Sequence, residues 1–197
     1  MLKNVKTFIS GGILGAFMVS LTASADPNFE VEPVNLSTLP GTLIHNPMAI
    51  KWDPVGGNKR VSIVESEGVP GGQAIAFQVK RKNISKPWEL RMRAPFDKDI
   101  LAEDSLEIYF WARAAKLPKG RDAGKISVVL GRNEEPYDTV INQDIAPTTT
   151  WKMYRVSGTA KRDFPASEAD MGFNFGHAKQ TIELGPYFAT RNASPTE

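Results

Sequence analysis

The chain has 197 residues, with 24 Lys and Arg against 22 Asp and Glu, and no cysteine. The absence of cysteine excludes disulfides, cysteine-ligated zinc sites and thiol nucleophiles. A net charge this close to zero argues against nucleic acid as a partner, because binding to phosphates requires a surplus of Lys and Arg.

Residues 1–25 have the layout of a secretory signal peptide. Lys3 and Lys6 precede an apolar run over residues 8–21, and Ala23-Ser24-Ala25 form a small-x-small cleavage site. The run contains three glycines and is shorter than the roughly 20 apolar residues of a membrane span, although an uncleaved anchor is the alternative. Cleavage before Asp26 leaves 22 basic and 22 acidic residues. We therefore expect a secreted or periplasmic protein that has no contact with membranes after signal cleavage.

The remaining chain has frequent strand signals and few helix signals. Residues 26–43 are expected to form an extended lead-in, and residues 192–197 a flexible tail. Between them, nine short stretches are separated by Gly, Pro, Asn and Asp clusters: 60–65, 74–80, 88–93, 105–113, 125–130, 138–143, 151–157, 171–175 and 181–188. This spacing predicts an all-β fold, an antiparallel two-sheet sandwich over residues 44–191.

The stretch 105–113 alternates with a period of two, which is typical of a strand packed on one side. One face carries Leu106, Ile108, Phe110 and Ala112, and the other carries Glu107, Tyr109, Trp111 and Arg113. Aromatic rings with polar neighbours on an outer face suit the apolar faces and hydroxyl rims of sugars. The alternative is that a second layer covers this face.

Catalytic motifs are few. The histidines are His45 and His177, and the sequence contains no Gly-x-Ser-x-Gly, His-Glu-x-x-His or calcium-loop motif. Glu134-Glu135 and the acids at 163, 168 and 170 supply candidate carboxylates for glycoside hydrolysis, but they lie in polar connections where acids are usually solvated. We therefore expect no catalytic residues and no metal site.

Five motifs in order resemble the carbohydrate-binding modules found beside bacterial endoglucanases and xylanases. They are Lys86-Pro-Trp-Glu-Leu90, Leu106-Glu-Ile-Tyr-Phe-Trp-Ala-Arg-Ala114, Trp151-Lys-Met-Tyr154, Gly172-Phe-Asn-Phe-Gly176 and Thr181-Ile-Glu-Leu184. The resemblance covers residues 28–189 and implies a galactose-binding-like jelly roll with sugar held across a concave sheet face. Many relatives have an Asp pair after the closing strand that helps to hold calcium, but Gly185-Pro186 stand there in this chain. No cofactor is expected, and structural calcium is left open.

Strand alternation and the resemblance together select the candidate sugar-binding residues. If Leu90 and Met92 join Phe110 in the core, the arginines between them share the outer face of Tyr109 and Trp111. Asn174, between two inward phenylalanines, is expected on the same kind of face. The resemblance adds Tyr137 at the lip of the cleft, and Trp88 would form a second platform. The candidate set is Tyr109, Trp111, Tyr137, Trp88, Asn174, Glu107, Arg91 and Arg113.

We therefore predict an exported, monomeric module that binds a polysaccharide or oligosaccharide without cleaving it. Three arginines on one face, at 91, 93 and 113, would favour uronic acids or other anionic sugars, although pairing with Glu89 and Glu107 is the alternative. A protein-docking module of an extracellular complex is the second hypothesis, and a glycoside-active enzyme is the third.

Overall fold

The computed structural model describes residues 39–47 and 50–192. The predicted signal peptide, most of the lead-in and the tail lie outside these residues. The described part contains eleven strands and two short 3₁₀ helices. They are β1 Thr42–Leu43, β2 Asp53–Val55, β3 Lys59–Glu65, β4 Gln73–Val79, η2 Pro87–Glu89, β5 Arg91–Pro95, β6 Ser105–Lys116, β7 Ile126–Arg132, β8 Thr139–Ile145, β9 Lys152–Thr159, η3 Ala166–Glu168, β10 Ala169–Asn174 and β11 Thr181–Asn192.

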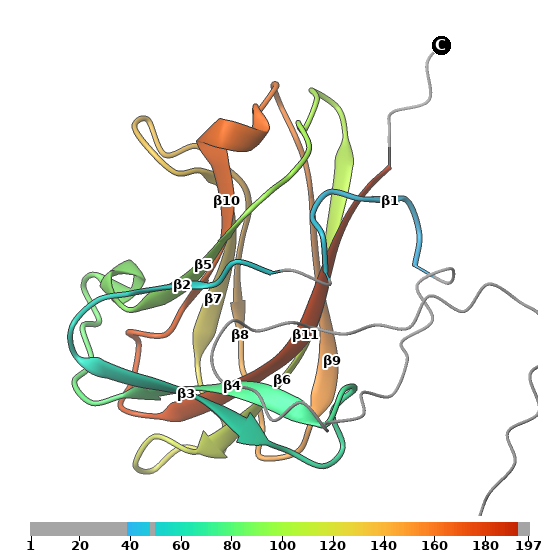
Figure 1. Cartoon of the computed structure of the whole chain (residues 1–197). Coiled ribbons are helices and arrows are strands. Elements are labelled where there is room, and N and C mark those ends of the chain that lie inside the picture. The colour runs from blue at the N-terminus through green and yellow to red at the C-terminus, as the bar shows by residue number, and fades with distance from the viewer. Residues whose placement is uncertain (1–38, 48–49, 193–197) are drawn as a thin grey trace, which may run out of the picture.

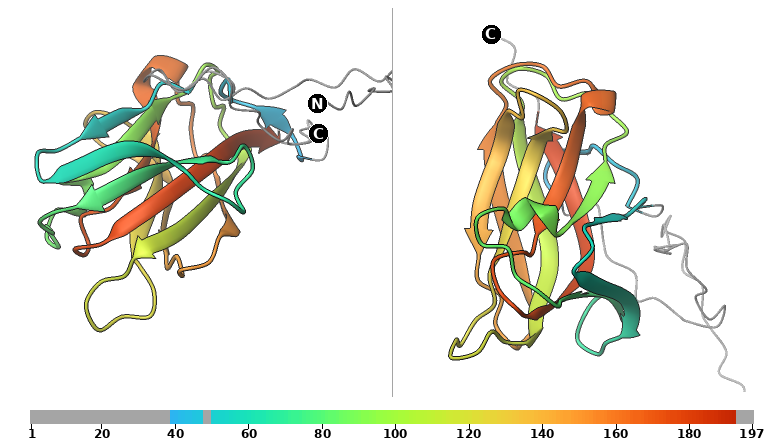
Figure 2. Two further views of the ribbon diagram at one scale, coloured as in Figure 1. Left: turned by 60° about the horizontal axis from the view of Figure 1, so that its bottom comes forward. Right: turned by 90° about the vertical axis from the view of Figure 1, so that its left-hand side faces the viewer.

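Two antiparallel sheets pack face to face (Figures 1 and 2). Sheet A has six strands in the order β3-β4-β11-β6-β9, with β1 added beside β11. Sheet B has five strands in the order β2-β5-β10-β7-β8. The predicted all-β sandwich is confirmed. No helix in the described part of the chain is long and apolar enough to cross a membrane.

The core lies between the sheets and follows from the alternation of β6. Leu106, Ile108 and Phe110 are fully buried in it. The Phe110 ring stacks on Tyr154 at 5.6 Å and meets the edge of Phe173 from sheet B at 5.0 Å between ring centroids. These contacts join the inner faces of both sheets.

β10 occupies the middle of sheet B, between β5 and β7. Met171 and Phe173 point inward into the core. The alternation therefore places Asp170, Gly172 and Asn174 on the outer face of sheet B. This confirms the outward direction expected for Asn174.

A β-bulge interrupts β11 at Gly185-Pro186. The register against β6 pairs Leu184 with Ala112 and Tyr187 with Phe110. Between these two pairs β11 therefore has one more residue than β6. Proline cannot donate to the ladder, which makes this position suitable for the irregularity. As a result, Tyr187 enters the core.

Each of the nine predicted strand stretches overlaps an observed strand, but their edges differ. Trp88 lies in η2 and not in a strand, because Pro87 occupies the first turn of that helix, where its missing N–H costs nothing. The short strands β1 and β2 were not predicted, because two or three residues cannot display a period of two.

Candidate functional site

The predicted sugar-binding face is divided between the two sheets. Glu107, Tyr109, Trp111 and Arg113 belong to β6 in sheet A, whereas Arg91 and Asn174 belong to β5 and β10 in sheet B. Both groups point away from the core, and therefore they lie on opposite outer faces of the sandwich. The prediction of one shared face was wrong, because β5 pairs with β2 and β10 and not with β6.

On the outer face of sheet A, Tyr109 and Glu107 are engaged with each other. The Tyr109 hydroxyl donates to the Glu107 carboxylate, which also accepts from Arg155 of β9. The Arg155 hydrogen bond holds the pKa of Glu107 below its usual value, and burial together with the Glu107 bond raises the pKa of Tyr109. The Arg155 guanidinium lies 5.9 Å from the Tyr109 ring centroid. Thus the ring that was expected to be an open platform is covered by a cation.

Trp111 and Arg113 are also engaged within sheet A. The Trp111 ring is half-buried and meets the Phe188 ring edge-on, with centroids 6.2 Å apart. Arg113 Nε donates to Glu183 Oε2 at 2.7 Å, and its guanidinium lies 5.1 Å from the centroid of the Trp151 ring. The side chains of this face therefore mainly satisfy one another.

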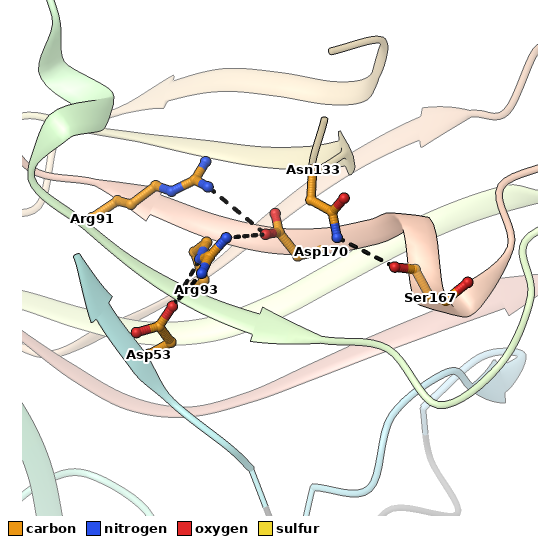
Figure 3. Close-up of polar contacts among 6 residues, drawn as sticks. All are labelled: Asp53, Arg91, Arg93, Asn133, Ser167 and Asp170. Carbon is orange, nitrogen blue, oxygen red and sulfur yellow. Dashed lines mark hydrogen bonds and ion pairs between the residues drawn. The ribbon is translucent and has the colours of Figure 1, made fainter. Parts of the chain in front are cut away.

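The outer face of sheet B carries a network of two arginines and two aspartates (Figure 3). Arg91 Nη2 lies 3.8 Å and Arg93 Nη1 lies 3.7 Å from Asp170 Oδ2. Arg93 also donates to Asp53 Oδ2 of β2 through Nε, at 3.0 Å, and through Nη2. We call these four residues the arginine–aspartate network. They come from three adjacent strands, and the register of those strands sets their relative positions.

Burial dominates the electrostatics of Asp170. Desolvation raises the pKa of this carboxyl above its usual value, and the charges of Arg91 and Arg93 oppose that rise. The two guanidiniums and two carboxylates of the network balance in charge, so this surface is polar without a net sign. Such groups present fixed donors and acceptors to a ligand while neither attracting nor repelling ions strongly.

Asn174 and Gly172 continue this polar surface along β10. Asn174 is buried, and its Oδ1 has no hydrogen-bond partner in the described structure. An alanine Cβ at Gly172 would lie 3.8 Å or more from its neighbours, among them the Arg91 side chain. An unsatisfied buried acceptor is uncommon, and here it lies beside the network.

A cavity of about 590 Å³ opens next to the network, at the end of sheet B where η2 leads into β5. Such a volume is within the range of small-molecule sites. It is lined by the β2–β3 turn, the segment that follows β4, and the start of β5: Val55, Gly56, Gly57, Asn58, Arg81, Lys82, Asn83, Glu89 and Leu90. Asn83 Nδ2 donates to Glu89 Oε2 at 2.6 Å, which fixes the wall beside Trp88.

Two exposed aromatic residues lie at opposite ends of sheet B. Trp88 is 51% exposed in η2, which is held at the C-terminal end of β10 by the bond from Gly176 N to Pro87 O. Tyr137 is 61% exposed in the β7–β8 loop, which is held at the N-terminal end of β10 by the bond from Asn133 N to Glu168 O. At about 3.3 Å per residue, β10 separates these ends by roughly 20 Å, a length that spans several sugar units.

No catalytic constellation is evident among the described residues. Ser127 Oγ lies 2.6 Å from Asp144 Oδ1 and 2.7 Å from His177 Nε2, so the serine stands between the acid and the histidine. In a nucleophilic triad the histidine takes that place. Of the candidate acids, Glu168 pairs with Arg132 and Asp163 accepts from Ala102 N. In the same part of the chain, no group of three or more His, Asp or Glu residues could hold a metal ion.

Several residues of this surface were absent from the predicted set. Asp53 lies in a three-residue strand that contains a proline, and the glycine turn that follows it carries no recognisable motif. Asp170 was considered only as a possible acid catalyst. Its position opposite the arginines depends on the pairing of β5 with β10, which no local pattern reveals.

Comparison with solved structures shows where this architecture occurs. A CBM4 structure superposes with a TM-score of 0.54 at 19% identity, covering 72% of this chain and 94% of that one. The second N-terminal cellulose-binding domain of β-1,4-glucanase C from Cellulomonas fimi gives a TM-score of 0.53 at 18% identity, covering 79% and 94%. The fold is the one found in carbohydrate-binding modules.

A third match is longer than this chain. The CBM22-1–GH10 modules of endo-1,4-β-D-xylanase 10B from Clostridium thermocellum, in complex with xylohexaose, give a TM-score of 0.51 at 10% identity. The match covers 72% of this chain and 26% of that one. No family model and no curated protein sequence matches the chain. At the level of the fold, the resemblance to carbohydrate-binding modules is confirmed.

Proposed function

We propose that this protein binds a neutral polysaccharide or oligosaccharide on the outer face of sheet B, without cleaving it, after export and removal of residues 1–25. The observation that carries the proposal is the arginine–aspartate network between two exposed aromatic residues, Trp88 and Tyr137. The shared fold supports it, since solved examples of that fold are named as cellulose-binding and xylanase-associated modules.

The chemistry of this face suits sugar hydroxyls. Each hydroxyl is both a donor and an acceptor, and the network offers guanidinium donors beside carboxylate acceptors. Because the arginines are already held by Asp53 and Asp170, they are ordered before the ligand arrives, and less conformational entropy is lost on binding. Trp88 and Tyr137 would stack on the apolar faces of sugar rings at the two ends.

The charge balance favours a neutral glycan over an anionic one. The sequence-based preference for uronic acids required Arg91, Arg93 and Arg113 on one face, but Arg113 lies on sheet A and is bound to Glu183. The two arginines that remain are matched by two carboxylates. We therefore propose a β-linked glucan or xylan as the ligand class.

Isothermal titration of the purified protein with cellohexaose, xylohexaose and an oligogalacturonate tests this proposal. We expect dissociation constants between about 1 mM and 1 μM for a neutral oligosaccharide, unchanged between low and physiological salt. Trp88→Ala should weaken binding by roughly fivefold, which corresponds to a loss of about 1 kcal/mol. The Tm of the protein should not change, because Trp88 is exposed.

Tyr109→Ala is the matched control, because Tyr109 is an aromatic residue on the opposite face. It should leave the affinity unchanged. Weaker binding by Tyr109→Ala together with unchanged binding by Trp88→Ala would move the site to sheet A. Tighter binding of the oligogalacturonate would overturn the neutral ligand class, and failure of the wild-type protein to bind any of the three would overturn the function.

A further inference from the structure

The cavity of about 590 Å³ at the end of sheet B has an excess of positive charge. The charged residues of its wall are Arg81, Lys82 and Glu89, and all three are exposed to solvent. Lys86 Nζ lies 3.7 Å from Glu89 Oε1 and offsets this carboxylate. Neither Arg81 nor Lys82 has an ion-pair partner among the residues that the structure describes. Two accessible cations therefore remain for a ligand.

The walls of this cavity are held by hydrogen bonds within the protein. Lys80 N donates to Asn58 O at 2.9 Å, which fixes the segment after β4 against the β2–β3 turn. Asn83 N donates to Gly176 O at 2.8 Å and fixes the other end of the same segment. The ammonium of Lys59 donates to a backbone carbonyl of the turn and adds a further positive charge there. The segment that carries the two cations is thus anchored on both sides before a ligand binds, which lowers the entropic cost of binding.

β2 connects the cavity to the arginine–aspartate network. Val55 lines the cavity and lies opposite Arg91 in the register of β2 and β5. Asp53, two residues earlier in β2, lies opposite Arg93 and accepts its hydrogen bonds. Two residues of a strand span roughly 7 Å. A side group on a glycan that lies over the network is therefore within reach of the cavity.

The charges of the two surfaces differ, and this difference selects the kind of side group. In the network, two guanidiniums are matched by Asp53 and Asp170. In the cavity wall, Arg81 and Lys82 are unmatched. A chain that is acidic at every unit would place carboxylates beside Asp53 and Asp170, which repel them. A neutral chain with one acidic side group places a carboxylate only at the cavity, where a guanidinium and an ammonium both bind carboxylates.

We propose that the cavity binds the carboxylate of a uronic acid side group on a neutral β-linked glycan, through Arg81 and Lys82. The amide of Asn83 and the carboxylate of Glu89 are placed to contact the hydroxyls of that side group, since both line the same wall. This ligand class rests on the proposed function, because the neutral backbone of the same glycan occupies the outer face of sheet B. The cavity adds a preference among such glycans for those with acidic branches.

Isothermal titration with two matched ligands tests this proposal. They are xylohexaose and the same oligosaccharide with a single glucuronic acid side group. The wild-type protein should bind the acidic ligand about fivefold more tightly at low salt, because exposed ion pairs each contribute modestly. The ratio of the two dissociation constants should approach one as salt is raised, since exposed charges are screened. The affinity for xylohexaose should not depend on salt.

The double variant Arg81→Gln, Lys82→Gln should bring the same ratio close to one at low salt. The matched control is Lys119→Gln, Arg121→Gln, which removes two exposed charges of the β6–β7 loop that do not line the cavity. This control should keep the preference. Equal affinity of the wild type for both ligands would overturn the proposal, and so would a preference that survives in the cavity variant or is lost in the control.

Failure of the proposed function gives a different result. If xylohexaose does not bind but the acidic ligand binds in a way that requires Arg81 and Lys82, the cavity site stands and the neutral chain on sheet B is overturned. If neither ligand binds, both proposals are overturned.

Discussion

Phe110 and Trp111 are neighbours in β6, but their side chains lie on opposite sides of sheet A. Phe110 is fully buried between Tyr154 and Phe173, whereas Trp111 is half-buried against Phe188. Truncation of a buried aromatic residue removes its contacts and leaves a cavity that the surrounding sheets cannot fill. The two positions therefore differ in what they contribute to stability.

Phe110→Ala should lower the free energy of unfolding by about 3–5 kcal/mol. Trp111→Ala should lower it by less, because part of the ring already contacts water. Urea denaturation of both variants beside the wild type measures the two losses. Equal, large losses at both positions would show that the outer face of sheet A is covered as completely as the core.

At the scale of the strand, two glycines in the sheets have opposite tolerance for a side chain. A Cβ at Gly172 in β10 would meet its nearest neighbour, Met92 O, at 3.8 Å, which is an ordinary contact. A Cβ at Gly158 in β9 would lie 2.3 Å from Val140 O of β8, where the edge strands of the two sheets approach each other. Gly158 is therefore required by that close approach, and Gly172 is not.

Gly172→Ala should keep or raise the free energy of unfolding, by up to about 1 kcal/mol, because glycine in a strand interior is costly. Gly158→Ala should destabilise the protein, because backbone atoms must move to accept the methyl group. Thermal denaturation of the two variants compares them directly. A clear decrease of Tm in Gly172→Ala would show that the Arg91 side chain beside that glycine cannot move to accept the methyl group.

The strands also show what could be predicted from the sequence. Alternation around Phe110 assigned each β6 side chain to the inner or outer side of its sheet, and Phe173 did the same for Asn174. Alternation contains no information about which sheet a strand joins. Arg91 and Tyr109 were therefore assigned to one face, although β5 pairs with β2 and β10, and β6 pairs with β9 and β11. These pairings are long-range, and the arginine–aspartate network depends on them.

At the scale of the whole molecule, His45 links stability to pH. Its imidazole accepts the Ala189 N–H of β11, the central strand of sheet A, and must be neutral to do so. Burial lowers its pKa from 6.5 to about 4 in the folded protein. Between pH 6.5 and 4 the unfolded chain is protonated at this residue, whereas the folded protein is not. Acidification therefore favours the unfolded state.

The free energy of unfolding should therefore fall as the pH drops from about 6.5 to 4, with a contribution from His45 of about 3 kcal/mol. Below pH 4 the folded protein also binds this proton, and His45 adds no further loss. Urea denaturation at pH 7, 5.5 and 4 measures the slope for the wild type and for His45→Gln, which cannot titrate. His177→Gln is the control and should keep most of the slope. A His45→Gln profile parallel to that of the wild type would contradict the assignment.

The bulge at Gly185-Pro186 has a consequence for the length of the chain. Side chains along a strand point alternately to the two faces of the sheet, and the extra residue shifts this alternation by one position in the middle of β11. Deletion of one of these two residues would give an unbroken alternation and leave Tyr187 in the core, because Leu184 and Tyr187 already face Ala112 and Phe110, which are two residues apart in β6. An unbroken alternation that kept both residues would instead turn Tyr187 outward and Phe188 inward. This segment of β11 can therefore lose one residue without a change in which later side chains face the core.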